Sequence, residues 1–371
     1  MNIGFDAKRA FWNQTGLGNY SRFILQGLAE FFPQHHYSLY SPSLHGPSPL
    51  FSPTPPLRPV NLGEGWKGNL ARVARMAPHF RHDRLDVYHG LSNELPFFNK
   101  THQTKLVVSI HDVLFLRYPH FYPLLDRSIY LAKTRHACRS SDLVLAISEQ
   151  TKQDLIAFLH VPERKIKVHY QACHPQFSRR HSAEEIESGK RKYGLKKPYI
   201  LQIGTLEERK NALFTLKAYA ASKLKGEVQV ALVGKKTPYC DMLYQFVQEA
   251  NLTDHVHFIH QSDFPDFPLL YKGALFCVYP SLFEGFGIPI LEALTVGSPV
   301  ITSTGGCFHE VGADAALYVD PSSVKQMSDA MERVFLEPSL RQEMIQKGAS
   351  QAARFAPGRL ISELFHHYED L

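Results

Sequence analysis

The sequence contains few cysteines, and no two of them are close together. No C-x-x-C motif occurs, and an odd number of widely spaced cysteines does not suit the disulfide framework of a secreted protein. We therefore expect reduced thiols, buried mainly as small apolar side chains. The five positions are Cys138, Cys173, Cys240, Cys277 and Cys307.

Long apolar runs are also missing. No stretch approaches the roughly 20 apolar residues that a membrane-spanning helix needs. The segment from Met1 to Arg9 carries charged side chains where a secretory signal requires an apolar run. The sequence thus predicts a cytoplasmic protein, associated with a membrane at most on its inner face.

Metal-binding patterns are absent as well. There is no H-x-x-x-H motif and no cluster of Cys and His, and the adjacent pairs His35-His36 and His366-His367 have side chains that diverge. No DxD motif occurs at the candidate site described below. The sequence therefore predicts a protein with no metal ion and no other cofactor.

What is present is a globular composition with an uneven charge. The 371 residues are 44% hydrophobic and 20% charged, which excludes disordered, collagen-like and coiled-coil proteins and favours two domains. Residues 1–180 hold 22 Lys and Arg against 12 Asp and Glu, whereas residues 181–371 hold 19 against 23. A basic half attracts anionic lipid, phosphorylated molecules or nucleic acid, or is only a solvated surface. Because no nucleic-acid-binding motif occurs, we expect no nucleic-acid partner.

Short apolar runs alternate with amphipathic stretches along the chain. This alternation predicts an α/β protein with parallel sheets covered by helices. The polar stretch at 177–197 predicts a boundary between a first domain, 1–180, and a second, 190–350. An apolar stripe within 351–371 predicts a docked final helix. The predicted strands are 2–6, 106–110, 143–147, 199–203, 228–233, 256–259, 275–279 and 300–302, and the predicted helices are near 20–31, 211–222, 239–250 and 289–296.

Two segments of the first domain have unusual composition. Seven prolines between Ser41 and Pro59 predict an extended loop or flap, because proline disrupts helix interiors and central strands. The basic stretch 66–84 is interleaved with Trp, Leu, Met and Phe. It has two interpretations, a peripheral membrane face or a core-packed helix with a basic outer surface.

A glycine loop precedes the first predicted helix. The run GLGNY places Gly16 and Gly18 where the N–H groups of a helix N-terminus approach an anion. Ser21 replaces the third glycine of the dinucleotide-binding fingerprint, so the loop does not indicate a nicotinamide cofactor. A plain tight turn is the alternative.

Two polar segments follow strands of the second domain. The run GTLEERKN carries Arg209 and Lys210 between a strand and a helix, an arrangement that suits a diphosphate. In the second segment, a glycine-rich turn joins Glu284 to Glu292, and its amides with Glu284 suit the hydroxyls of a polar ligand. We expect Glu292 on the same face as Glu284. An exposed cation pair and an ordinary helix N-terminus are the alternatives.

His111 directly follows the predicted strand 106–110 in the first domain. At a strand end, a histidine can exchange a proton with a ligand in a cleft. With 20 histidines in the chain, a structural role is the alternative.

Taken together, these residues resemble the nucleotide-sugar-dependent glycosyltransferases of family 4, also called group 1, which are retaining enzymes of the GT-B architecture. The resemblance covers the second half almost end to end, including FHEVGADAALYVDP at 308–321, and the first half at scattered points. The motifs that carry it are the GLGNY loop, His111, the ISE segment at 147–149, GTLEERKN, and the E-x7-E run from Glu284 to Glu292.

The resemblance implies two Rossmann-like domains facing each other across a cleft, with the last helix crossing back onto the first. Many members carry Arg directly after the strand-ending glycine, where this chain has Thr205, and we expect Arg209 to substitute. The implied roles are Arg209 and Lys210 at the donor diphosphate, Glu284 and the amides of Phe286, Gly287 and Ile288 at the sugar hydroxyls, Glu292 at the ribose, Thr205, Gly16 and Gly18 bordering the donor, and His111 beside the transferred sugar.

The resemblance also implies an activity. We expect a retaining, metal-independent hexosyltransferase that moves a hexose from a GDP- or UDP-linked donor, first of all mannose from GDP-mannose, to a hydroxyl of a growing surface glycan or lipid-linked glycan. A nucleotide-sugar epimerase of the same architecture and a non-catalytic sugar-nucleotide-binding subunit are the alternatives. The joint presence of His111, Lys210 and Glu284 argues against the non-catalytic alternative.

Overall fold

The computed structural model describes residues 1–44, 51–97 and 103–371, and the chain divides into two compact units. Unit 1 comprises Met1–Ala172 and Phe355–Leu371, and unit 2 comprises Cys173–Arg354. The boundary lies before the predicted interval 180–190, because η3 (Pro175–Ser178) packs on helices of unit 2. The final segment returns to unit 1, whose α2 contacts the last helix.

Unit 1 is built on a single parallel sheet. In the described residues its strand order is β3-β2-β1-β4-β5-β6-β7, the order of a doubly wound fold. The central strands are buried along their length, as strands covered on both faces must be. The strands are β1 (Asn2–Asp6), β2 (His36–Ser41), β3 (Leu57–Asn61), β4 (Val87–Gly90), β5 (Lys105–Ile110), β6 (Leu143–Ala146) and β7 (Ile166–Val168).

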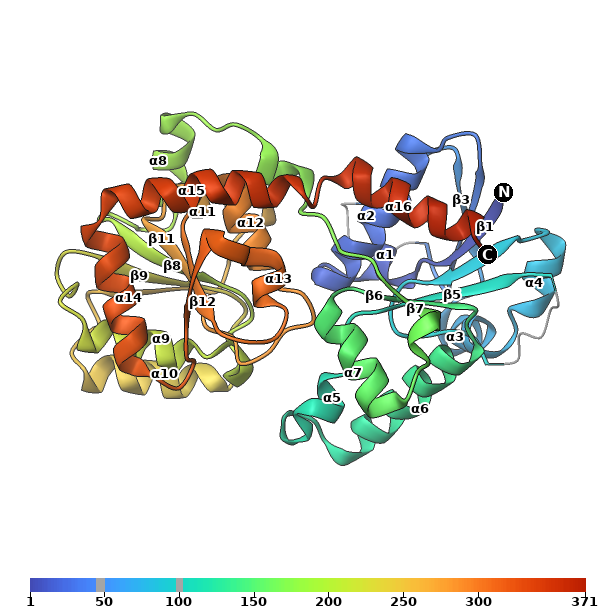
Figure 1. Cartoon of the computed structure of the whole chain (residues 1–371), viewed down its shortest axis with the longest axis horizontal. Coiled ribbons are helices and arrows are strands. Elements are labelled where there is room, and N and C mark those ends of the chain that lie inside the picture. Colours follow the sequence, from blue (N-terminus) through green and yellow to red (C-terminus); the bar gives the residue numbers. More distant parts are fainter. Residues whose placement is uncertain (45–50, 98–102) are drawn as a thin grey trace. The chain divides into compact units, whose positions relative to one another are not determined.

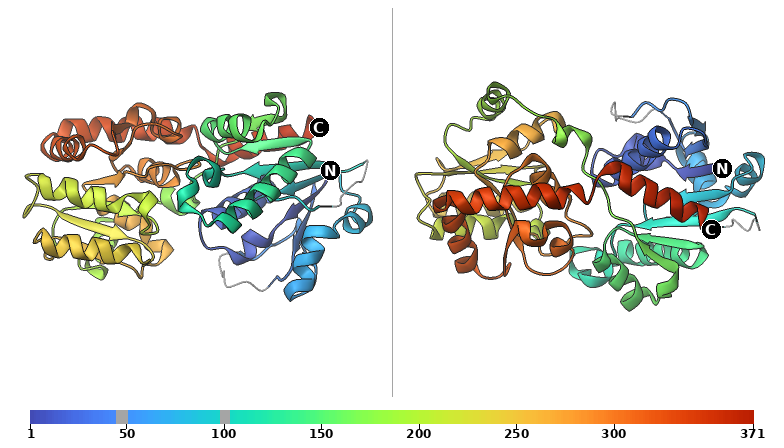
Figure 2. Two further views of the ribbon diagram at one scale, coloured as in Figure 1. Left: turned by 90° about the horizontal axis from the view of Figure 1, so that it is seen from below. Right: turned by 45° about the horizontal axis from the view of Figure 1, so that its top comes forward.

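Helices cover both faces of this sheet. One core joins the sheet to Phe80, Cys138 and Leu155, which come from three different helices. On the other face α16 runs along α2 (Figure 2). The helices are α1 (Lys8–Trp12), α2 (Gly16–Phe31), α3 (Gly65–Ala74), α4 (Ala77–His82), α5 (Leu114–Arg117), α6 (Leu124–Ser140), α7 (Glu149–Leu159) and α16 (Pro357–Glu369), with 3₁₀ turns η1 (Pro119–Phe121) and η2 (Glu163–Lys165).

The loop in the proline-rich segment is shorter than the sequence predicts. Its end, from Leu57, belongs to β3, which lies at the edge of the sheet. Pro59 is tolerated there because an edge strand needs hydrogen bonds on one side only. Residues 45–50 of the predicted loop lie outside the described residues.

Unit 2 repeats the same architecture with the strand order β10-β9-β8-β11-β12-β13, again all parallel. Figure 1 shows α9, α10 and α14 along one face of this sheet and α11, α12 and α15 along the other. The strands are β8 (Tyr199–Ile203), β9 (Gln229–Val233), β10 (Val256–Ile259), β11 (Phe276–Tyr279), β12 (Val300–Ser303) and β13 (Ala316–Val319). The helices are α8 (Ala183–Lys192), α9 (Ala212–Ala221), α10 (Tyr239–Glu249), α11 (Phe267–Gly273), α12 (Ile288–Val296), α13 (Phe308–Gly312), α14 (Val324–Leu336) and α15 (Pro338–Ala353), with 3₁₀ turns η4 (Glu208–Lys210), η5 (Phe264–Asp266) and η6 (Ala313–Ala315).

The five cysteines are free thiols, and all except Cys173 are buried. The described residues contain no helix with both the length and the apolar character needed to cross a membrane.

Candidate active site

The two polar segments of unit 2 meet because of the strand order. β8 and β11 are parallel neighbours at the centre of the sheet, where the order of the strands reverses. The segment after β8 carries η4, and the segment after β11 leads to α12. Both therefore emerge at the same edge of the sheet, at the switch point where ligands of doubly wound folds bind.

Arg209, Lys210 and Glu284 form an ion cluster at this edge. One oxygen of Glu284, Oε1, lies 2.6 Å from Lys210 Nζ and 2.7 Å from Arg209 Nη1. Arg209 also donates to the backbone oxygen of Phe283 at 2.9 Å. The structure thus brings together the three charged residues predicted for the diphosphate and the sugar.

The electrostatics of the cluster favour the ionised form of Glu284. Burial alone raises the pKa of Glu284, but Lys210 and Arg209 outweigh burial and lower this pKa to about 2. Burial lowers the pKa of Lys210, and Glu284 partly offsets that effect. The carboxylate is therefore fully ionised near neutral pH and holds two cations at one point of the sheet edge.

Two residues that the sequence did not single out complete the cluster. Lys210 Nζ donates to Tyr279 Oη at 2.7 Å, and Arg209 Nη2 donates to Glu207 Oε1 at 2.6 Å. Tyr279 is the last residue of β11, so its strand-end position was a usable signal. Glu207 lies within GTLEERKN, where the sequence does not indicate which of the adjacent residues Glu207 and Glu208 would contact Arg209.

Glu292 has a different partner from Glu284. It is buried within α12, and its Oε2 accepts a hydrogen bond from Tyr271 Oη at 2.9 Å. Burial raises the pKa of Glu292 to about 7, against the hydrogen bond from Tyr271 and the charge of Lys210. This carboxyl can therefore be neutral near pH 7. A neutral carboxyl can both donate a hydrogen bond to a ligand hydroxyl and accept one from it. Tyr271 lies within α11, away from the motifs that the sequence singles out, so nothing in the sequence indicated this contact.

The turn before α12 depends on Gly287. This residue is the N-cap of α12 at φ 102°, a conformation that favours glycine. Phe286 precedes it, and Ile288 begins the helix, whose first N–H groups lack intrahelical partners. A helix N-terminus of this kind attracts anions and hydroxyl oxygens. Thr205 lies in the segment after β8, half-buried, and its backbone oxygen accepts from Glu207 N at 2.9 Å.

In unit 1, His111 occupies the equivalent edge of the sheet, directly after β5. Its Nε2 lies 2.9 Å from the backbone oxygen of Leu91, which can only accept, so Nε2 carries the proton and Nδ1 is an acceptor. Burial lowers the pKa of His111 to about 4. The imidazole is therefore neutral at physiological pH and does not act there as a cation.

His111 lines a cavity of about 280 Å³ within unit 1. The Tyr20 ring contacts the imidazole edge-on, with ring centroids 4.7 Å apart. Tyr122 and Tyr130 supply aromatic surface and their rings meet edge to face. The other lining residues are Arg9, Leu17, Ser92, Asn93, Glu94, Asp112, Phe115, Lys133 and Thr134.

Gly16 and Gly18 begin α2 near this edge and differ in their surroundings. A Cβ on Gly18 would lie 1.8 Å from the backbone oxygen of Asn13, and the Gly18 amide donates to Asn13 Oδ1 at 3.1 Å. A Cβ on Gly16 would meet nothing within 4 Å. Gly18 is therefore required by packing, whereas Gly16 is not.

Comparison of the sequence with known families matches both halves of the chain. The family described as glycosyl transferases group 1 matches residues 184–351, and the family described as glycosyltransferase family 4 matches residues 15–176. The O-antigen chain mannosyltransferase B of Escherichia coli is 30% identical over 288 residues, which cover 76% of this chain and 74% of that protein. The O-antigen chain mannosyltransferase RfbU of Salmonella typhimurium is 28% identical over 231 residues, covering 61% and 60% of the two chains.

Solved structures resemble the whole chain. Sucrose-phosphate synthase of Thermosynechococcus elongatus aligns with a TM-score of 0.78 at 18% identity, covering 100% of this chain and 98% of that one. HepE of Anabaena, solved in complex with UDP and glucose, aligns with a TM-score of 0.76 at 17% identity over both full chains. These likenesses confirm the predicted fold, two Rossmann-like parallel-sheet units of the GT-B type.

Proposed function

This chain belongs to the group 1 glycosyltransferases of family 4, and from that membership we propose that it transfers mannose from GDP-mannose to a hydroxyl of a growing surface glycan. The ion cluster of Arg209, Lys210 and Glu284 carries the proposal, because two fixed cations at a sheet edge suit the diphosphate of a nucleotide sugar. The O-antigen mannosyltransferases among the relatives support the sugar and the acceptor. The neighbour that binds UDP and glucose makes UDP-linked sugars the competing donors.

The proposed reaction retains configuration at the sugar. The bond between C1 of mannose and the β-phosphate oxygen breaks, and the acceptor oxygen bonds to C1 on the same face. The acceptor's proton passes to the departing phosphate oxygen, so the products are GDP and a glycan longer by one residue. Lys210 and Arg209 stabilise the charge that develops on the diphosphate, which is the main contribution that a preorganised site makes.

We propose that no metal ion takes part, because the two cations occupy the place where charge develops. The described residues also include no group of three His, Cys, Asp or Glu side chains placed to hold an ion. Turnover measured with and without EDTA tests this proposal. Loss of all turnover in EDTA, restored by Mg²⁺ or Mn²⁺, would refute it.

The cavity beside His111 is the proposed acceptor pocket. Its tyrosines offer the flat apolar faces on which sugar rings pack, and its charged residues offer hydroxyl partners. A neutral His111 with an acceptor nitrogen suits a hydrogen bond from a sugar hydroxyl.

We also propose a peripheral membrane location, as a lipid-linked acceptor requires. Trp66 is 71% exposed and Leu70 is 43% exposed on α3, beside the cation Lys67. The apolar side chains of Met76 and Phe80, later in the basic stretch, are buried. Sedimentation with anionic vesicles tests this location. Equal sedimentation of wild-type protein and Trp66→Ala, or none by either, would count against α3 as the contact.

A donor panel tests the function itself. GDP-mannose, other GDP-sugars, UDP-sugars and ADP-sugars are compared by thermal shift and by slow hydrolysis without acceptor. A ligand at 100 times its Kd adds about 2.7 kcal/mol to the stability, which is a readily measured shift. We expect GDP-mannose to stabilise the protein and to release GDP and mannose. A free epimerised nucleotide sugar as product would instead indicate an epimerase, and stabilisation without turnover in the presence of a glycan acceptor would indicate a binding subunit.

A further inference from the structure

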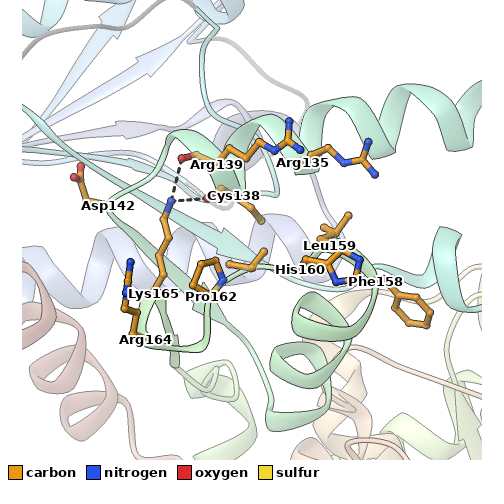
Figure 3. A pocket seen from close by; sticks show the side chains of 11 residues that line it. Arg135, Cys138, Arg139, Asp142, Phe158, Leu159, His160, Pro162, Arg164 and Lys165 are labelled. Atoms are coloured by element: carbon orange, nitrogen blue, oxygen red, sulfur yellow. Dashed lines mark hydrogen bonds between the residues drawn. The ribbon is translucent and has the colours of Figure 1, made fainter.

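Unit 1 contains a second, larger cavity. It lies at the amino ends of the strands, whereas His111 lies at their carboxyl ends. It measures about 870 Å³ and is formed by the C-terminal ends of α6 and α7 and by the starts of β6 and β7 (Figure 3). His111 follows the carboxyl end of β5, and all strands of the sheet are parallel. The two cavities are therefore separated by the length of the strands, which for four residues is about 13 Å.

Three arginines without carboxylate partners line this cavity. Arg135 and Arg139 project from α6 and Arg164 comes from η2, and all three are exposed (Figure 3). Among the described residues, no Asp or Glu lies within 4.0 Å of any of their guanidinium nitrogens. Their positive charge is therefore available to a ligand.

The neighbouring carboxylates are engaged elsewhere. Asp142, which also lines the cavity, accepts from the backbone N–H of Leu106 at 2.7 Å. Glu163 pairs with Lys152 at 2.8 Å. Neither carboxylate pairs with the three arginines, so the lining of the cavity carries an excess of positive charge.

Lys165 fixes the shape of the cavity instead of contributing a free charge. Its Nζ donates to the backbone oxygens of Cys138 at 2.7 Å and Arg139 at 3.0 Å, the last turn of α6 (Figure 3). A cation at a helix C-terminus stabilises that end of the helix. The two arginines of α6 are therefore presented by a rigid element.

The lining also includes apolar side chains. Phe158, which is 38% exposed, Leu159 and Pro162 line the cavity together with the arginines. A ligand here would meet both guanidinium groups and hydrocarbon within one cavity. The volume lies within the range of about 300–1,000 Å³ that is usual for small-molecule sites.

We propose that this cavity is a binding site for a phosphoryl-bearing anion, separate from the donor site. Arg135, Arg139 and Arg164 bind the phosphoryl oxygens, because the planar guanidinium fork matches them bidentately. Phe158 and Pro162 contact the less polar remainder of the ligand. The shared chemistry is a phosphate or diphosphate ester, supplied either as a soluble compound or as the headgroup of an anionic lipid. The inference does not depend on which sugar the enzyme transfers.

Arginine footprinting locates the site directly. The full chain is treated with phenylglyoxal in the presence and absence of inorganic pyrophosphate, and modified arginines are mapped by peptide mass spectrometry. We expect pyrophosphate to slow modification of Arg135, Arg139 and Arg164 by about tenfold, as bidentate contacts shield the reacting nitrogens. Exposed Arg81 and Arg180 serve as internal controls and keep their rates. Because the method resolves residues, binding of pyrophosphate at Arg209 is scored separately.

A matched pair of variants tests whether the arrangement or only the charge matters. The variant R135Q/R139Q/R164Q removes three exposed cations from the cavity, and K196Q/K223Q/K225Q removes three exposed cations from unit 2. In titration calorimetry we expect only the first to lose the pyrophosphate binding that is separate from the Arg209 cluster, with circular dichroism unchanged in both. Equal losses in the two variants would overturn the proposal.

Vesicles distinguish the two sources of the ligand. Phosphatidylglycerol vesicles that protect the same three arginines, where phosphatidylcholine vesicles do not, assign the site to a lipid headgroup. Protection by pyrophosphate without protection by either vesicle assigns it to a soluble ester. If pyrophosphate protects none of the three arginines, the proposed site does not exist.

Discussion

Lys210 and Arg209 are held in place by the carboxylate that they share. Both contact one oxygen of Glu284, so this residue offsets part of the charge of two half-buried cations and holds them close together. Removing one partner of such a cluster leaves charge without compensation in a partly desolvated site. The position of the cations, and with it their action on a leaving diphosphate, should therefore depend on Glu284.

We predict that Glu284→Gln and Lys210→Ala each lower turnover by about a hundredfold, the size of a lost transition-state contact. Glutamine keeps the shape of Glu284 but not its charge, so circular dichroism should be unchanged. The measurement is the initial rate of transfer at saturating donor. Glu208→Gln, which removes an exposed carboxylate from the same segment, should retain the wild-type rate. Wild-type rates in either site variant would show that the cluster is structural only.

Glu292 should make the stability depend on pH. Its pKa is about 7 in the folded protein and near 4.5 when exposed, so the folded state retains a proton that the unfolded state has released. Stability is therefore present at low pH and is lost as pH rises from about 4.5 to 7, by roughly 3 kcal/mol for a shift of this size.

Urea unfolding at pH 5 and pH 8 measures this effect. Glu292→Gln keeps an acceptor for Tyr271 but does not ionise. We expect the variant to gain stability over wild type at pH 8 and to differ little from it at pH 5. Glu249→Gln, on the exposed surface of α10, should have the same stability as wild type at both pH values. Parallel curves for Glu292→Gln and wild type would mean that Glu292 is already ionised in the folded state.

At the scale of single elements, the start of α2 is organised by Asn13. Its Oδ1 accepts from the amides of Thr15 and Gly18, which have no intrahelical partner, and from the Thr15 hydroxyl. This network draws the chain so close to Gly18 that no side chain fits there. Gly16, two residues earlier in the first turn of α2, has open space.

We predict opposite outcomes for two otherwise similar substitutions. Gly18→Ala forces the chain away from Asn13 and should lower the thermal midpoint of the protein by several degrees, as backbone displacement costs about 1–3 kcal/mol. Gly16→Ala should leave the midpoint unchanged and reduce only donor affinity if Gly16 borders the phosphates. Thermal unfolding and donor titration of both variants provide the measurement. A destabilised Gly16→Ala would contradict the steric argument.

The sequence predicted those elements whose apolar pattern was strong. β8, β9 and β11 are buried runs between polar segments, and the structure places them within one residue of the predictions. β4 was missed because it has four residues and includes His89, which is buried only because Tyr368 and Ser109 satisfy its ring nitrogens. The beginning of α2 was also missed, since its first turn carries no apolar periodicity.

The site was predictable only in part, for a physical reason. Both polar segments could be placed after strands of the second domain, but the contact of Lys210 with Glu284 could not be predicted from that placement. Hydrogen-bond partners depend on side-chain directions after folding, so the pairing of Tyr271 with Glu292 carried no sequence signal. The neutral state of His111 likewise follows from burial, which a strand-end position does not reveal.

For the whole molecule, the essential feature is that the chain leaves unit 1 and later returns to it. Unit 2 is inserted between Ala172 and Phe355, so unit 1 is complete only when α16 has been added. Tyr368 Oη bonds to His89 Nδ1 at 2.6 Å, and His169 Nε2 bonds to the Leu360 backbone oxygen at 2.8 Å. The last helix therefore closes the core of the first unit.

We predict that Ile361→Ala destabilises unit 1 selectively. Ile361 is fully buried and rests against Gly27 of α2, where a Cβ would come within 2.5 Å of its Cγ1. Truncation leaves a cavity between α2 and α16, which for a buried isoleucine costs about 2–5 kcal/mol. Hydrogen exchange should accelerate in α2 and α16 and stay at the wild-type rate in α9 of unit 2, because α16 belongs to unit 1 and packs on α2. His366→Ala, on the exposed face of the same helix, should change neither. Equal acceleration in α2 and α9 would show that the two units unfold together, and that the returning helix stabilises the molecule as one cooperative body.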